Sequence, residues 1–124
     1  MKIKSREFVK TLFEFQLDLK MYHWRTFKHP RHKATDKLMT NLLEFIDLFV
    51  EAYMGKYKRV DTPYTIELKK NITDKNAVSK LMNPFASFLK TWKKDLGEEE
   101  DEFVNLIEEI EVKLERTKYL MTLS

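Results

Sequence analysis

The residues that could bind a metal ion are concentrated in one stretch of the chain, residues 23–55. This stretch contains all three histidines and three acids at helical spacing: His23, His29, His32, Asp36, Asp47 and Glu51. Nitrogen and oxygen ligands of this kind suit iron, manganese or zinc. No Pro or Gly interrupts the chain between Lys33 and Met54, so we expect one long helix there.

Helical periodicity divides this predicted helix into distinct faces. At about 100° per residue, four candidate ligands share one face: His32, Asp36, Asp47 and Glu51. The opposite face has an apolar stripe with the spacing of a bundle core: Leu38, Leu42, Phe45, Phe49 and Ala52. Further apolar residues lie beside the carboxylates: Met39, Leu43, Ile46, Val50 and Met54. Exposed apolar surfaces usually meet a partner, so we expect the ligand face to be an interface.

Distance along the helix indicates how many chains one site needs. The centre of the pair His32 and Asp36 lies fifteen residues from the centre of the pair Asp47 and Glu51, roughly 22 Å at about 1.5 Å per residue. One ion cannot span that gap. Two copies packed antiparallel about a two-fold axis near residues 41–42 would bring one pair opposite the other, twice. We therefore predict a homodimer with two sites between its subunits.

This arrangement resembles the Dps mini-ferritins, the DNA-protecting, ferritin-like proteins of starved bacterial cells. The resemblance rests on His23-Trp24, His32-x3-Asp36 and Asp47-x3-Glu51, with ten residues between the two aspartates. It implies a ferritin-like four-helix bundle, twelve-subunit shells built from dimers, and oxidation of Fe(II) by peroxide or oxygen. It also implies that two subunits share each metal site: His23, His32 and Asp36 from one, and Asp47 and Glu51 from the other.

The chain departs from the Dps pattern in two places. The segment between the His-Trp pair and His32 is shorter than in the family, which predicts a tighter turn at residues 28–31. Ala52-Tyr53 stand where an arginine is usual. Short Dps-like proteins of phages and large viruses are more similar still, with an aspartate, Phe-Val-Glu and Tyr-x-Gly in this order. A viral member would act in the host cytoplasm or the virion.

The sequence is also compatible with two other functions. A nucleic-acid-coating protein without oxidation activity is one, since a basic surface attracts phosphate. Dps-like proteins often bind DNA through a lysine-rich terminal arm, but only residues 1–4 precede the first predicted helix, and the lysines are scattered. The other is a structural helical bundle whose acids simply face solvent. The metal is also open, because iron, manganese and zinc all accept these ligands.

Composition favours one all-helical domain over residues 1–124. The chain is 43% hydrophobic and 35% charged, with two glycines and three prolines, which argues against sheets and disorder. No apolar run could cross a bilayer and the first eight residues lack a signal-peptide core, so we expect a cytoplasmic protein with no membrane partner. The absence of cysteine excludes disulfides and thiolate metal sites.

Periodicity predicts four helices, at about residues 5–27, 32–55, 74–96 and 98–121, with a long crossover at residues 56–73 between the second and third. Ser5 and Asp74 are the expected N-caps of the first and third helices. Asn83-Pro84 predicts a kink or restart in the third, and the fourth opens with acids, where the helix dipole favours them. We expect His29 to be a surface residue in the turn and Trp24 to pack near the site.

Overall fold

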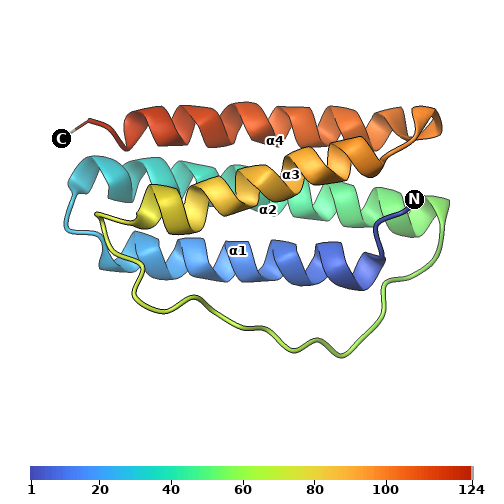
Figure 1. Ribbon diagram of the computed structural model, residues 1–124, viewed down its shortest axis with the longest axis horizontal. Coiled ribbons are helices and arrows are strands. Elements are labelled where there is room, and N and C mark those ends of the chain that lie inside the picture. The colour runs from blue at the N-terminus through green and yellow to red at the C-terminus, as the bar shows by residue number, and fades with distance from the viewer. Residues whose placement is uncertain (124) are drawn as a thin grey trace.

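The computed structural model describes residues 1–123. It contains four long helices: α1 Ser5–Arg25, α2 His29–Lys56, α3 Asn83–Asp95 and α4 Asp101–Leu120. A short π-helical segment, η1 Val78–Met82, leads into α3, and a 3₁₀ turn, η2 Glu98–Glu100, leads into α4. Residues 1–123 contain no strand (Figure 1). The prediction of an all-α, four-helix protein is therefore confirmed.

One continuous core holds the four helices together. On α2 the buried positions include the stripe predicted opposite the ligand face, except that Ala52 is half-buried. The fully buried side chains Leu12, Leu38 and Leu89 come from α1, α2 and α3, and Phe103 and Ile107 come from α4. Burying one such side chain stabilises the fold by about 1.5–3 kcal/mol. The core therefore fixes which side of α2 faces outward.

The connection between α2 and α3 runs back along the outside of α1 (Figure 1). Arg6 donates a hydrogen bond to the Pro63 carbonyl, and further along α1 the carboxylate of Glu14 accepts one from the Glu67 N–H. Because this crossover returns the chain to the end of the bundle where α2 begins, α3 runs parallel to α2 and α4 antiparallel to both. The long crossover is confirmed, and residues 57–73 form no helix.

The turn between α1 and α2 is tighter than predicted. α1 ends at Arg25 and α2 begins at His29, so that only residues 26–28 lie between them. Pro30 fits the first turn of α2 because a helix needs no hydrogen bond from that backbone N–H. The expectation that His29 lies in the turn was wrong, although its side chain is exposed as expected.

The predictions that Ser5 and Asp74 are N-caps were also wrong. Ser5 is the first residue of α1, and no side chain caps that helix. Before η1, Thr73 and Asn76 cap each other: the Thr73 N–H donates to Asn76 Oδ1 and the Asn76 N–H donates to Thr73 Oγ1, a reciprocal capping arrangement. Asp74 is thereby free to make other contacts.

The predicted restart before α3 takes the form of a π turn. In η1 the N–H of Asn83 donates to the carbonyl of Val78, one residue further back than in an α-helix. Pro84 has no N–H, and its ring would crowd the carbonyl four residues earlier in a regular helix. The wider turn relieves that conflict just before the proline, as π-bulges do elsewhere.

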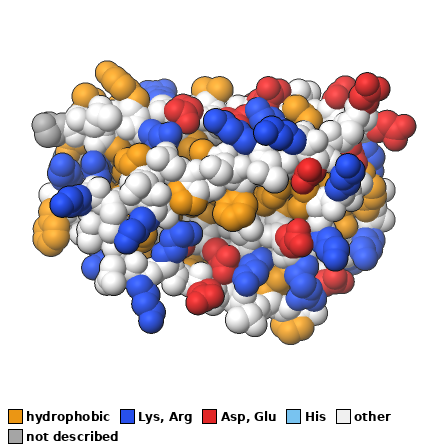
Figure 2. All heavy atoms as spheres, in the orientation of Figure 1, with side chains coloured by type: hydrophobic (Ala, Val, Ile, Leu, Met, Phe, Trp, Pro, Cys, Tyr) orange, Lys and Arg blue, Asp and Glu red, His pale blue; other side chains and the backbone are white. Residues whose placement is uncertain are grey.

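Charge is distributed unevenly over the surface. Figure 2 shows several acidic side chains at the end of the molecule where α4 begins, and both acidic and basic side chains over the rest of this face. Residues 98–102, in η2 and the first turn of α4, are all acidic, and acids there complement the positive end of the α4 dipole. Among residues 1–123, no helix is long and apolar enough to cross a membrane.

Candidate metal site

The structure brings two of the predicted ligands together across the α1–α2 turn. His23 lies in the last turn of α1 and His32 in the first turns of α2. Their imidazole rings stack, with centroids 3.9 Å apart and planes inclined by 19°. His23 is 7% exposed, whereas His32 faces solvent. The tight turn therefore creates a histidine pair at the edge of the core.

Each ring uses its Nδ1 atom in a hydrogen bond. His32 Nδ1 lies 3.0 Å from the backbone carbonyl of His23, which can only accept, so this nitrogen is the one that has the proton. His23 Nδ1 lies 3.0 Å from the hydroxyl oxygen of Thr35. Metal-binding histidines commonly use one ring nitrogen in this way, which fixes the tautomer and leaves the other nitrogen for the ion.

The near-parallel planes limit how the pair could bind metal. The lone pair of an imidazole nitrogen lies in the plane of its ring, and a nitrogen binds an ion such as zinc at about 2 Å. Lone pairs in two stacked planes cannot meet at one ion at that distance. Two ions side by side suit the stacked pair, and metal pairs in enzymes lie about 3.5–4 Å apart.

The three predicted acidic ligands do not join the histidine pair within one chain. Asp36 lies one turn after His32, and Asp47 and Glu51 lie toward the other end of α2, all on its solvent-exposed side. Among the residues that the structure describes, no three His, Asp or Glu side chains form a group that could hold a metal ion. One chain thus presents two imidazoles and, separately, an acid-bearing helix face.

Apolar side chains lie among these acids, as the sequence predicted, with one exception. Leu43 is 52% exposed near the middle of α2, and Met39, Val50 and Met54 are half-buried. Ile46 is instead buried in the core, because α2 has core neighbours on that side. On α1, Trp24 is 63% exposed beside the histidine pair, so its expected packing role would need a second molecule.

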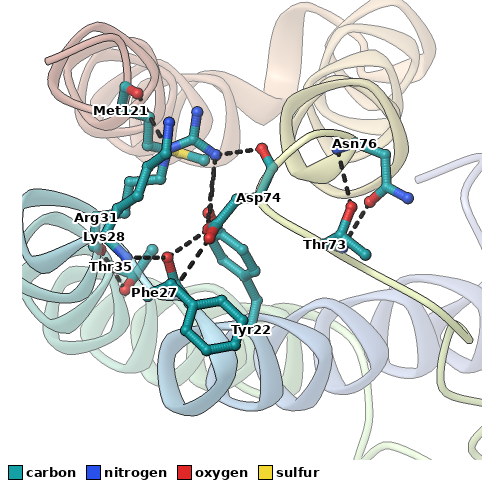
Figure 3. A network of polar contacts seen from close by, with 10 residues as sticks. Tyr22, Phe27, Lys28, Arg31, Thr35, Thr73, Asp74, Asn76 and Met121 are labelled. Carbon is teal, nitrogen blue, oxygen red and sulfur yellow. Dashed lines mark hydrogen bonds and ion pairs between the residues drawn. The ribbon is translucent and has the colours of Figure 1, made fainter. Parts of the chain in front are cut away.

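A polar network that the sequence pattern did not predict holds the α1–α2 turn (Figure 3). The carboxylate of Asp74 accepts hydrogen bonds from the hydroxyls of Tyr22 and Thr26 and from the Phe27 N–H. Arg31 Nη1 donates to the Tyr22 hydroxyl oxygen at 2.9 Å and to the backbone carbonyl of Asp74 at 2.6 Å. This network ties both ends of the turn to the segment that leads into η1.

The network lowers the pKa of Asp74. Burial by itself would raise the pKa of this carboxyl, but the hydrogen bonds that it accepts and the nearby Arg31 charge hold it below its usual range. Arg31 also donates through Nε to the Met121 carbonyl after α4. The sequence signal for this role of Asp74 was weak: Thr73 and Asn76, which lie on either side of it, are also residue types that cap helices.

A second buried carboxylate fixes the crossover to α1. Asp18 is 2% exposed; its Oδ1 accepts a hydrogen bond from the Lys69 N–H at 2.9 Å, and Lys69 Nζ lies 3.8 Å from its Oδ2. Here burial is the larger effect, and it raises the pKa of Asp18 despite the Lys69 contacts. The pKa of Asp18 is therefore raised above the ordinary value for an aspartate, whereas that of Asp74 is lowered below it.

At the far end of the bundle, a third polar cluster joins α2 to η2. Lys56 donates from Nζ to a carboxylate oxygen of Glu100 at 3.0 Å, and the Tyr57 hydroxyl also bonds to Glu100. Hydrogen bonding to Glu100 raises the pKa of Lys56 to about 12. The N-terminal ammonium also lies 3.3 Å from a Glu100 carboxylate oxygen, so this cluster ties the start of the chain and the end of α2 to η2.

The described residues form an all-α protein with a stacked histidine pair at the end of its α1–α2 hairpin. The chain belongs to the family of unknown function DUF5856, whose model matches residues 23–121. The matched residues begin at His23 and include all five candidate ligands. No curated protein sequence and no solved structure matches the chain.

Proposed function

We propose that this protein is a Dps-like, ferritin-type homodimer that binds Fe(II) at two intersubunit sites and oxidises it with peroxide or oxygen. The main support is the stacked pair His23 and His32, whose Nδ1 atoms are both hydrogen-bonded and whose Nε2 atoms remain for metal. The parallel course of α2 and α3 after a long crossover also fits a ferritin-like bundle. Protection against oxidative damage would be the biological consequence.

The proposed dimer pairs the exposed faces of two α2 helices in antiparallel orientation. Its axis passes near residues 41–42, where Met39 and Leu43 would meet the same residues of the second copy. Leu43 is half exposed in the single chain, and burying it would stabilise the pair by the hydrophobic effect. The same packing would bring Asp47 and Glu51 of each copy beside the histidine pair of the other.

The two kinds of ligand have distinct tasks in this proposal. The imidazoles bind Fe(II) as neutral donors, and the carboxylates offset the charge of the ions and suit Fe(III) better than Fe(II), because they are hard anionic oxygens. Two Fe(II) ions each lose one electron to one peroxide, which takes up two protons and leaves as two waters. Carboxylates in an apolar interface would be costly without a cation, so metal and dimer should stabilise each other.

The test is anaerobic addition of Fe(II), followed by peroxide, with ferric absorbance recorded against time. We expect rapid oxidation by the native protein and little by the double variant Asp36→Ala plus Glu51→Ala. A matched control replaces two exposed acids of α4, Glu109→Ala plus Glu115→Ala, and should oxidise Fe(II) as the native protein does. Equal rates for the native protein and the Asp36/Glu51 variant would refute the proposed site.

A further inference from the structure

Thr35 is a polar side chain in a position where the helix pattern calls for an apolar one. It is 0% exposed and lies on the core side of α2, three residues after His32. A buried hydroxyl is costly unless it is hydrogen-bonded. Thr35 makes its contacts with the α1–α2 site: Oγ1 lies 2.7 Å from the Arg31 carbonyl and 3.0 Å from His23 Nδ1.

The direction of these two hydrogen bonds follows from counting protons. Thr35 has one hydroxyl proton, and the Arg31 carbonyl oxygen can only accept. Were that proton directed at His23, two oxygens would face each other at 2.7 Å with no proton between them. The hydroxyl therefore donates to the carbonyl, and its oxygen accepts a proton from His23. His23 is consequently the tautomer that has its proton on Nδ1.

This tautomer is the less common one for neutral histidine in water, where the proton prefers Nε2. His32 reaches the same tautomer without Thr35, because its Nδ1 donates to the His23 carbonyl. Only His23 depends on a side-chain hydroxyl. The two rings therefore differ in the group that accepts the Nδ1 proton, which is a hydroxyl oxygen for His23 and a backbone carbonyl for His32.

We propose that Thr35 is a positioning residue that holds His23 with its proton on Nδ1, so that Nε2 presents an unprotonated lone pair to a divalent cation. The part of this inference that concerns a cation rests on the proposed function. The part that concerns the proton does not, since it follows from contacts within one chain.

The first measurement is the tautomer itself, by ¹⁵N NMR of the imidazole nitrogens in metal-free protein at mildly alkaline pH, where histidine is neutral. We expect Nδ1–H for both rings in the native protein. In Thr35→Val, which keeps the shape and removes the hydroxyl, His23 should change toward Nε2–H while His32 does not. Thr35→Ser, which restores the hydroxyl, should return His23 to Nδ1–H.

A matched control is available on α4. Thr117 is also buried and donates its hydroxyl to the carbonyl four residues earlier, Lys113, at 2.8 Å. Thr117→Val therefore removes the same kind of bond away from the histidines, and should leave both tautomers unchanged. Thr35→Ala replaces Thr35→Val if the latter does not give native helix content by circular dichroism.

The second measurement is Zn²⁺ binding by calorimetry, with zinc as a redox-inert probe. Loss of an outer hydrogen bond to a ligand typically weakens metal binding by roughly 10- to 100-fold, and we expect this for Thr35→Val but not for Thr35→Ser or Thr117→Val. An unchanged His23 tautomer in Thr35→Val overturns the inference even if zinc binds. If the His23 tautomer changes in Thr35→Val but the native protein binds no zinc, the role of Thr35 is supported and the proposed function is refuted instead.

Discussion

His32 donates its Nδ1 proton to the backbone carbonyl of His23, and the two imidazoles stack 3.9 Å apart. A side chain of α2 thereby depends on the backbone of α1 for its orientation. The pair forms only if the three-residue turn brings the two helix ends to the same height. Changes that loosen the turn should therefore affect any ligand bound by the pair.

Asp74→Ala should destabilise the protein, because it removes the acceptor for Tyr22, Thr26 and the Phe27 N–H in a partly buried place. A hydrogen bond to a charged group contributes about 1.5–3 kcal/mol, so the free energy of unfolding should fall by about that amount or more. Urea denaturation would measure the fall. The control is Asp101→Ala, an exposed acid at the start of α4, which should change stability far less.

Stability should depend on pH in opposite senses at Asp74 and Asp18. The folded pKa of Asp74 is lowered, so its contribution is full above the unfolded pKa of about 3.9 and disappears as the pH falls through the folded value. The folded pKa of Asp18 is raised, so stability falls as the pH rises from the unfolded toward the folded value.

Unfolding measured at several acidic pH values separates the two carboxyl groups. The free energy of unfolding of the native protein, minus that of Asp74→Asn, should grow as the pH rises. The same difference for Asp18→Asn should shrink as the pH rises through the range in which Asp18 titrates. Stability differences that both grow, or both shrink, as the pH rises would contradict the opposite environments inferred from the contacts.

Leu43→Glu should convert the proposed dimer to a monomer. It places a charge at the point where two α2 helices would meet about the axis, and burial of an unpaired charge is strongly unfavourable. Light scattering would report the mass. Val112→Glu changes another exposed apolar residue, 67% exposed on α4, and should leave the dimer intact. A native protein that is monomeric with or without metal would refute the shared site.

Divalent metal should raise the midpoint of thermal unfolding, and a chelator should reverse the rise. Ligand at about 100 times its dissociation constant stabilises the state that binds it by about 2.7 kcal/mol. Anaerobic Fe(II) or Mn²⁺, followed by scanning calorimetry, would show the shift. His32→Ala should abolish it. His29→Ala changes an exposed histidine that lies outside the stacked pair, and should retain it.

The helical period of α2 was readable from the sequence because core and solvent faces alternate at a fixed spacing. Its stripe from Leu38 to Phe49 is buried, and the acids from Asp36 to Glu51 are exposed, as predicted. Helix ends were predicted less well. The error at Asp74 arose because several nearby polar residues could cap a helix, and only the contacts show that Thr73 and Asn76 do so.

The sequence by itself determined that this chain forms four amphipathic helices, that one of them has acids on its outer face, and that two histidines flank a tight turn. Only the tertiary structure decided which nitrogen of each histidine is protonated and what holds the turn. Periodicity describes neighbours on one helix, whereas the histidine hydrogen bonds cross from one helix to the next. The hydrogen bonds that hold the turn join residues 52 positions apart, as for Tyr22 and Asp74, or 90 apart, as for Arg31 and Met121. Such partners are chosen by packing of the whole bundle, which no local pattern specifies.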